Sequence, residues 1–192
     1  MRPRERVATY EDILALPDHV VGEIVEGELF VSPRPASPHA YAAFVLGAWL
    51  HRYVGGGGDG PAGWWILPEP ELHLGRDVFV PDYAGWLRVR LPVLPSVSYF
   101  TLEPDWVCEI VSPSSTRLDR FHKLPRYAHH GIPYAWILDP ISRGLEVYHL
   151  DGENYTLLKT FVGEQPIRAE PFDTVDLPLE RLWLPTLPDP QS

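Results

Sequence analysis

Hydrophobic residues come in short groups along the chain, separated by glycine, proline and charged residues, and this pattern predicts short helices and strands. Residues 9–16 are typical of a short helix with a threonine as its N-cap. Residues 20–25 and 28–31 lie on either side of Glu26-Gly27, a pair that favours a tight turn between two strands. The N-terminal part of the chain therefore predicts a helix followed by a β-hairpin.

A longer helix is predicted to begin at Ser37-Pro38, because serine is a favoured N-cap and proline suits the first helical position. Apolar residues recur along this helix at spacings of three and four, which predicts one buried face. The glycine run at residues 55–58 is expected to end the helix. The residues expected on its buried face are Tyr41, Phe44, Val45, Ala48 and Trp49.

The rest of the chain carries apolar runs that predict strands, with one more helix among them. This order favours a central mixed β-sheet flanked by helices, which is an α/β or α+β sandwich. The predicted strands are 64–67, 71–74, 78–82, 106–111 and 134–138, with a strand and a loop in 83–104, a helix over 116–130, and a hairpin made by 146–150 and 155–161.

Length and composition agree with one globular domain that spans residues 1–192. Hydrophobic residues make up 45% and charged residues 22% of the chain, which is ordinary globular usage. The apolar runs are too short to cross a membrane, and the N-terminus does not resemble a secretory signal, so we expect a cytoplasmic protein without a membrane partner. The single cysteine, Cys108, excludes an internal disulfide and is expected in the core. The proline-rich tail, residues 182–192, is expected on the surface.

The most informative segment is Asp105-Trp-Val-Cys-Glu-Ile-Val111, because Glu109 interrupts an apolar run that predicts a buried strand. A buried and unpaired carboxylate costs roughly several kcal/mol. An arginine partner, or a position at a solvent-facing strand end, would remove this cost in an ordinary way. The alternative is that a bound metal ion compensates the charge of Glu109, which would make it a functional residue.

Asp82 and Lys123 support a metal site at the edge of the sheet. Asp82 ends the predicted strand 78–82, where an aspartate can also simply begin a turn. Two carboxylates from different strands can converge on one cation, and Mg²⁺ needs little more than these, a backbone carbonyl and water. Lys123 lies on the helix that follows Glu109, and it is either an ordinary surface lysine or a group that orients water at the metal.

Three blocks of residues stand in an order and spacing that resemble the Uma-two family of restriction-endonuclease-like proteins, within the PD-(D/E)xK nuclease superfamily. Each block alone is short, and the specificity lies in their order. The resemblance covers a core of about residues 9–179. The blocks are Gly22-Glu-Ile-Val-Glu-Gly-Glu-Leu29, Val80-Pro-Asp82, and Glu109-Ile-Val-Ser-Pro-Ser-Ser-Thr116, the last followed by Asp119, Lys123, Tyr127 and the run from Gly131 to Pro140.

The resemblance implies the restriction-endonuclease-like fold and a set of site residues. It assigns Asp82 and Glu109 as the carboxylates that bind Mg²⁺ or Mn²⁺, and we add the backbone carbonyl of Ile110 as a third metal ligand. It implies that Lys123 positions the attacking water, and it marks Glu23 as an assisting catalytic residue.

Three features of the chain bear on these assignments. The superfamily lysine commonly lies two residues after the second acid, where this chain has Val111, so its role passes to Lys123 on the next helix. Pro125 is tolerable in the first turn of a helix, but deeper in a helix it removes a hydrogen bond at a cost of about 3 kcal/mol. Glu71 matches another acidic position and is a further candidate ligand or water-positioning group.

These residues favour a metal-dependent endonuclease that hydrolyses DNA phosphodiester bonds. The resemblance also implies a homodimer, because many nucleases of this type cut two strands with two sites. The formal net charge of −10 works against this interpretation, because tight DNA binding depends on lysine and arginine. A non-catalytic interaction module that keeps the nuclease fold, or a phosphodiesterase acting on another phosphate ester, therefore remains an alternative.

Overall fold

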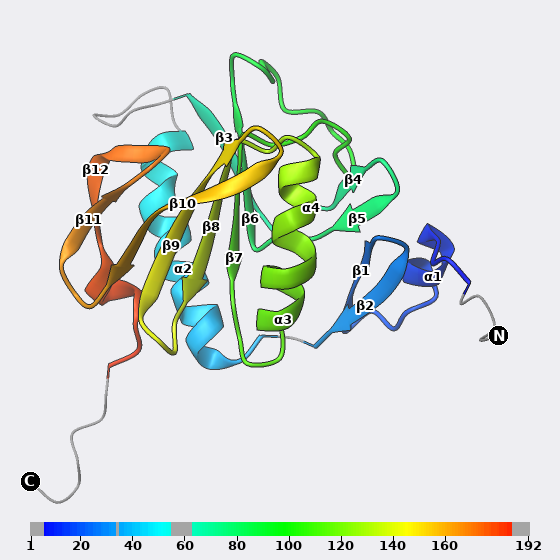
Figure 1. Cartoon of the computed structure of the whole chain (residues 1–192), viewed down its shortest axis with the longest axis horizontal. Helices are drawn as coiled ribbons and strands as arrows, with labels where there is room; N and C mark the ends of the chain where they lie inside the picture. Colours follow the sequence, from blue (N-terminus) through cyan, green and yellow to red (C-terminus); the bar gives the residue numbers. More distant parts are fainter. Residues whose placement is uncertain (1–5, 34, 55–62, 186–192) are drawn as a thin grey trace, which may run out of the picture.

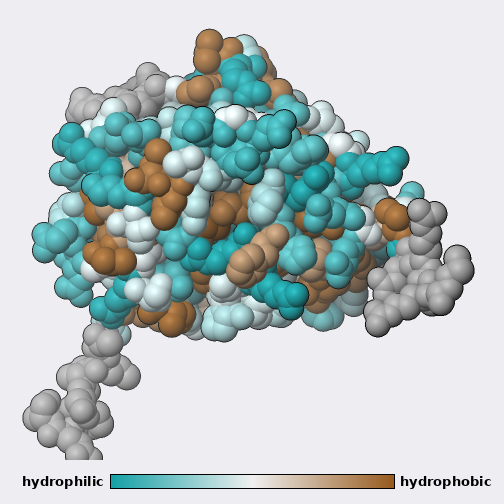
Figure 2. Space-filling view, viewed as in Figure 1, coloured by the Kyte–Doolittle hydropathy of each residue, from teal (hydrophilic) through white to brown (hydrophobic). Residues whose placement is uncertain are grey.

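The computed structural model describes residues 6–33, 35–54 and 63–185, which form three β-sheets and the helices that pack on them (Figure 1). The glycine run expected to end the second helix lies outside these described residues. No helix in the described ranges combines the length and the apolar composition needed to cross a membrane. Figure 2 shows hydrophilic side chains over most of one face, with smaller hydrophobic patches between them.

The central sheet has six strands in the order β10-β9-β8-β7-β6-β3. Only β7 and β8 run parallel, and the other neighbours are antiparallel, so the sheet is mixed as predicted. The strands are β3 (Trp64–Pro68), β6 (Tyr83–Leu87), β7 (Trp106–Ile110), β8 (Tyr134–Asp139), β9 (Gly144–Asp151) and β10 (Asn154–Val162).

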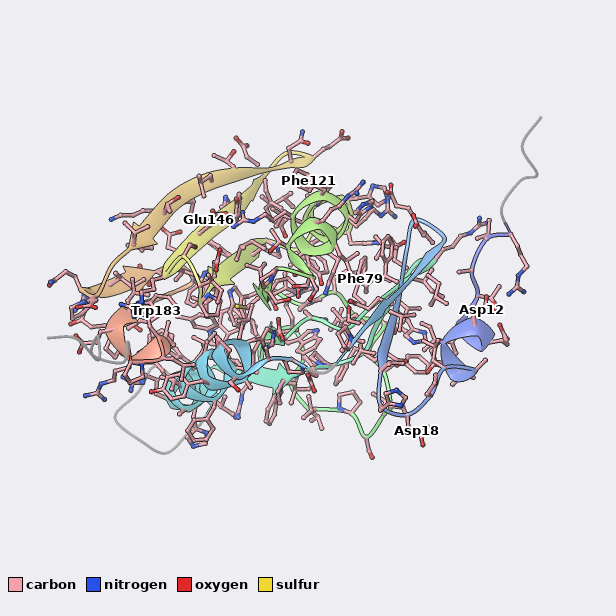
Figure 3. The ribbon with its side chains drawn as sticks, turned by 90° about the horizontal axis from the view of Figure 1, so that it is seen from below. Asp12, Asp18, Phe79, Phe121, Glu146 and Trp183 are labelled. Carbon is pink, nitrogen blue, oxygen red and sulfur yellow. The ribbon has the colours of Figure 1, made fainter. Side chains whose placement is uncertain are left out.

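Helices cover both faces of this sheet. Helix α2 (Ser37–Val54) lies on one face, and the helical segment between β7 and β8 lies on the other (Figures 1 and 3). Parallel neighbours need a crossover connection, and this segment supplies it. It consists of α3 (Thr116–Leu118), a π-helical turn η1 (Asp119–Lys123) and α4 (Leu124–His129).

Pro125 does not break the crossover helix. It lies near the start of α4, directly after the π-helical turn η1. A proline ring collides with the carbonyl four residues before it in a regular α-helix, and a wider turn before the proline relieves that collision. Lys123 therefore sits in the widened turn, ahead of the proline.

A second sheet packs beside the first and has the order β2-β1-β5-β4. Its hairpin turns at Glu26-Gly27, as predicted, and both residues adopt a positive φ. The short helix α1 (Tyr10–Leu14) precedes it, and the Thr9 N–H donates to the Asp12 carboxylate at 2.8 Å. The strands are β1 (Val21–Val25), β2 (Glu28–Ser32), β4 (Leu72–Leu74) and β5 (Asp77–Phe79).

The predicted strand 78–82 was wrong at its end. Strand β5 stops at Phe79, and Asp82 lies in a bend directly before β6. Pro81 has no N–H to donate to a sheet partner, which explains why pairing stops before it. Asp82 therefore precedes a central strand, at the point where the chain passes from the second sheet to the first.

The predicted buried face of α2 was wrong for Tyr41, Phe44 and Ala48, whereas Trp49 is buried and Val45 is partly buried against the core. Phe44 is 75% exposed and Tyr41 also faces solvent. Apolar residues surround most of this helix, so two different sets show spacings of three and four. Packing selects the set that comprises Ala42, Leu46, Trp49, Leu50 and Tyr53.

A C-terminal hairpin that the sequence pattern did not predict completes the packing around α2. Strands β11 (Pro166–Ala169) and β12 (Phe172–Pro178) form it, and a 3-10 turn η2 (Leu179–Leu182) follows. The Tyr53 hydroxyl donates to the Phe172 carbonyl at 2.9 Å. Leu182 and Trp183 are buried, so the expectation of a surface tail from residue 182 was wrong at its first two residues.

The alternation of side chains along β7 divides the core into two clusters. Trp106, Cys108 and Ile110 belong to the cluster on the α2 side, and Val107 belongs to the cluster that contains Tyr127 of α4. Successive residues of a strand point to opposite faces, so Glu109 points to the same side as Val107. This places the carboxylate of Glu109 under the crossover helix.

Candidate active site

A pocket of about 420 Å³ lies where the second sheet, the start of α2, the end of β7 and the crossover helix meet. Each of the site residues expected from the sequence lines this pocket, except Glu71. Five carboxylates and one lysine face it, so its lining is strongly acidic. The lining residues that carry charge or could bind a cation are Glu23, His39, Glu69, Asp82, Glu109, Asp119 and Lys123, with the backbone of Ile110 beside them.

Glu109 is buried, with 3% of its surface exposed. Its Oε1 accepts a hydrogen bond from the Tyr127 hydroxyl at 2.5 Å and lies 2.8 Å from Lys123 Nζ. A lysine and a tyrosine, rather than an arginine or solvent, therefore compensate its charge. Burial raises the pKa of Glu109 well above its ordinary value, although the ammonium of Lys123 opposes this shift.

Lys123 occupies the centre of the site, with 2% of its surface exposed. Its Nζ lies 2.8 Å from Glu109 Oε1, 2.8 Å from Glu23 Oε1 and 3.7 Å from Asp119 Oδ1. Burial alone would lower the pKa of Lys123, but these three carboxylates outweigh it and raise the pKa well above its ordinary value. Lys123 is thus a buried ammonium group at neutral pH, and the interpretation of it as a surface lysine was wrong.

Glu23 reaches the site from strand β1 of the second sheet. Its Oε1 accepts a hydrogen bond from the Val80 N–H at 2.8 Å in addition to its contact with Lys123. The side chain is buried, so both contacts are made away from solvent. Glu23 therefore links the second sheet to the crossover helix through Lys123.

Asp82 approaches the end of β7 from the bend before β6. Its Oδ2 accepts a hydrogen bond from the Ile110 N–H at 2.6 Å, and its Oδ1 lies 2.9 Å from His39 Nε2. Its backbone carbonyl accepts from the Glu69 N–H at 3.1 Å. The Asp82 carboxylate is thereby fixed next to the residue that follows Glu109.

Two residues of the site were not expected from the sequence. Asp119 was named only among the residues that carry the family resemblance and was given no role in the site, yet its side chain is buried beside Lys123 in the π-helical turn. Burial raises the pKa of Asp119 to about 6, although Lys123 and a hydrogen bond with Ser115 act in the opposite direction.

His39 is the second unexpected residue, and it lies in the first turn of α2. Burial acts to lower its pKa, but the hydrogen bond with Asp82 and the charges of Asp82, Asp119 and Glu69 outweigh burial and raise the pKa. A lone histidine without a neighbouring ligand motif gave no signal for this role in the sequence.

Glu71 does not line the pocket. Its Oε1 accepts a hydrogen bond from the Tyr10 hydroxyl at 2.8 Å and lies 2.6 Å from His73 Nε2. These contacts hold α1 against β4. Glu69, two residues earlier, lines the pocket instead, and it does so with a positive φ of 45°, which is uncommon for a residue other than glycine.

The donor set of the pocket fits a hard divalent cation. The contacts of Glu109 with Lys123 and Tyr127 use only Oε1, which leaves Oε2 for another ligand. In the part of the chain that the structure describes, no three His, Cys, Asp or Glu side chains form a ligand group by themselves. A cation here would therefore depend on Asp82, Glu109, the Ile110 carbonyl and water, which suits Mg²⁺ because it keeps several waters.

Comparison with known proteins agrees with the fold and the family. The Uma2 family model, described as "Putative restriction endonuclease", matches residues 8–180. A solved structure described as a "putative nuclease belonging to DUF820" from Anabaena variabilis matches with a TM-score of 0.74 and 20% identity, covering 91% of this chain and 97% of that chain. A search of curated proteins found no match. This chain has the restriction-endonuclease-like fold and belongs to the Uma2 family.

Proposed function

We propose that the protein is a Mg²⁺- or Mn²⁺-dependent endonuclease that hydrolyses phosphodiester bonds of DNA. The observation that carries this proposal is the convergence of Asp82, Glu109 and Lys123 on one pocket from three separate elements. Membership of the Uma2 family supports nuclease chemistry.

The metal ion would be held by Asp82, Glu109 and the Ile110 carbonyl. When bound, it would polarise the scissile phosphate and offset the negative charge that develops in the transition state. The lining of the pocket, with five carboxylates against one lysine, favours a cation at this place. Without such an ion, a phosphate would meet mainly repulsive charge.

Lys123 is proposed to orient the attacking water and to stabilise negative charge on the phosphate. Its raised pKa keeps it protonated at neutral pH, so it donates hydrogen bonds and does not accept the proton of the water. Glu23 assists by holding the ammonium together with Glu109, each at 2.8 Å from Nζ. Tyr127 fixes the Glu109 carboxylate through a hydroxyl that burial and the charge of Glu109 keep protonated, because both raise its pKa.

The test is cleavage of supercoiled and linear DNA by purified protein with added Mg²⁺ or Mn²⁺, against the same protein in EDTA. We expect Asp82→Ala to lower the cleavage rate by at least about 100-fold, the scale found when a group that stabilises transition-state charge is lost. Asp151→Ala, at an exposed turn of the β9–β10 hairpin, is the matched control and should cleave normally. Cleavage that survives Asp82→Ala would contradict the assignment.

The net charge of −10 favours a second candidate, a protein that keeps this fold without acting on long DNA. Such a protein would be a non-catalytic interaction module or a phosphodiesterase for a smaller phosphate ester. Calorimetry that detects no binding of Mg²⁺ or Mn²⁺ at millimolar concentration would support the module. Metal-dependent hydrolysis of bis(p-nitrophenyl) phosphate, without cleavage of DNA, would support the smaller ester.

We also propose that the protein acts as a homodimer in the cytoplasm. Two identical subunits would place two pockets on a duplex, one for each strand. Light scattering of the purified protein, with and without DNA, measures the number of subunits. A monomer in both conditions would exclude the dimer.

A further inference from the structure

His39 contacts one of the proposed metal ligands directly. It lies in the first turn of α2, with 14% of its side chain exposed, and its Nε2 is 2.9 Å from Asp82 Oδ1. A carboxylate can only accept a hydrogen bond, so Nε2 must carry the proton that is shared. His39 therefore donates to Asp82.

The contact between His39 and Asp82 is built into the packing of α2 on β6. Tyr83, the residue after Asp82, donates its hydroxyl to the Ala43 carbonyl one turn after His39, at 2.7 Å. The same hydroxyl lies so close to Gly47 that a Cβ there would come within 2.5 Å of it. The contacts of Tyr83 with Ala43 and Gly47 thus fix α2 on β6, and with it the position of His39 next to Asp82.

The second ring nitrogen of His39 shows that the residue is not placed for stability alone. Nδ1 is buried and has no hydrogen-bond partner among the described residues. A buried polar atom without a partner destabilises the folded state, and such atoms in folded proteins call for an explanation. The contact with Asp82 explains this atom: the ring orientation that brings Nε2 to the carboxylate leaves Nδ1 without a partner.

Both oxygens of Asp82 are held by donors from other elements. The Ile110 N–H binds Oδ2 at 2.6 Å, and His39 binds Oδ1. Hydrogen bonds of this kind fix the plane of a carboxylate before a ligand arrives, and loss of such a partner lowers metal affinity. We propose that His39 is a positioning residue that orients Asp82 for a divalent cation, an inference that rests on the proposed metal-dependent function.

The test compares the affinity for Mn²⁺, measured by calorimetry on the full chain, in the wild type and three variants. His39→Ala should weaken binding by about 10- to 100-fold, the range found for residues that orient metal ligands. His39→Gln should restore most of the affinity, because the glutamine amide can donate from near the position of Nε2. His51→Gln, at an exposed histidine of the same helix, should bind as the wild type does.

A double variant separates positioning from a general effect on folding. If His39 acts through Asp82, adding His39→Ala to the Asp82→Asn variant should weaken Mn²⁺ binding no further. A full additional loss in the double variant, or wild-type affinity in His39→Ala, would overturn the inference. Should His39→Ala fold poorly, the ¹⁵N signals of the His39 ring in the wild type decide: a proton on Nε2 supports the contact, and a neutral ring with the proton on Nδ1 overturns it.

The outcome for His39 is distinguishable from the outcome for the proposed function. If the protein binds Mn²⁺ in a His39-dependent manner but cleaves no DNA, the positioning role of His39 is supported and the proposed DNA substrate is contradicted. If the wild type and His39→Ala cleave DNA at the same rate and bind Mn²⁺ with the same affinity, the proposed function is supported and the positioning role of His39 is contradicted.

Discussion

Lys123 Nζ and Glu109 Oε1 lie 2.8 Å apart in a part of the interior that solvent hardly reaches. The same ammonium is 2.8 Å from Glu23 Oε1, so one positive charge serves carboxylates from β7 and β1. Such an arrangement makes the fold and the site depend on the same residue. A change at Lys123 therefore has consequences for stability as well as for catalysis.

Replacing Lys123 with Met should destabilise the protein by about 3–5 kcal/mol at pH 7.5, because it leaves the carboxylates of Glu109 and Glu23 buried without their cation. Urea denaturation in the presence of EDTA measures this difference in the free energy of unfolding. The chain has one other lysine, Lys159, which is exposed on β10, and Lys159→Met is the matched control. Equal stability of the two variants would show that Lys123 does not neutralise these acids.

Replacing Asp119 should raise the stability of the protein, whereas replacing Lys123 should lower it. The pKa of Asp119 is raised to about 6 from 3.8, so its contribution to stability is fully present below pH 3.8 and is lost as the pH rises through about 6. Asp119→Asn removes this dependence. The variant should therefore gain stability relative to the wild type between pH 4 and pH 7, by on the order of 1–3 kcal/mol.

The measurement for Asp119 is denaturation of both proteins across this pH range in EDTA. A difference in the free energy of unfolding that stays constant from pH 4 to pH 7 would contradict the raised pKa. Because the side chain lies in the pocket, we also expect Asp119→Asn to lower nuclease activity. A gain in stability together with a loss of activity is the pattern expected of a charge retained for function.

Asp77 provides a carboxylate outside the pocket whose pKa is shifted in the other direction. It accepts hydrogen bonds from Arg126 Nε at 2.8 Å and the Glu26 N–H at 2.8 Å, and it lies 2.8 Å from His130 Nε2. Burial acts to raise its pKa, but these contacts outweigh burial and lower it below 3.8. The Asp77 cluster joins the β1–β2 hairpin, which carries Glu23, to helix α4.

Asp77→Asn should cost about 3 kcal/mol at pH 7, because it leaves Arg126 without its buried partner. A lowered pKa contributes stability above the unfolded value of 3.8, and this stability is lost as the pH falls through the folded value. The difference between variant and wild type should therefore shrink below about pH 4. Denaturation at pH 7, 5 and 3.5 tests this, and a pH-independent difference would contradict it.

The candidate site could be predicted from the sequence where a residue conflicts with its surroundings. Glu109 in an apolar strand is such a conflict, and it directed attention to Asp82 and Lys123. The position of His39 depends on a tertiary contact that no local pattern carries, and Asp119 was missed although its spacing from Lys123 is local. Asp119 and Lys123 are four residues apart on one helical segment, a spacing that was visible in the sequence but was not used, whereas His39 meets Asp82 across 43 positions of the chain.

The fold shows the same division between local patterns and tertiary contacts. Strand β7 and the β9–β10 hairpin were predicted and found, because their apolar residues and turn residues leave few alternatives. The β11–β12 hairpin was not predicted, because charged residues interrupt both strands and prolines stand at their outer ends and in the turn between them. The buried face of α2 packs against this hairpin, so it could not be identified while the hairpin itself was not predicted.

The orientation of α2 leads to a direct comparison of two apolar residues on the same helix. Leu46 is completely buried in the cluster on the α2 side, and Phe44 is 75% exposed. Leu46→Ala should lower the free energy of unfolding by about 2–5 kcal/mol, because it opens a cavity in the core. Phe44→Ser should change it by less than about 0.5 kcal/mol, as is usual for an exposed position. Urea denaturation of the two variants measures both effects, and a larger loss for Phe44→Ser than for Leu46→Ala would mean that the helix packs through the face first expected from its sequence.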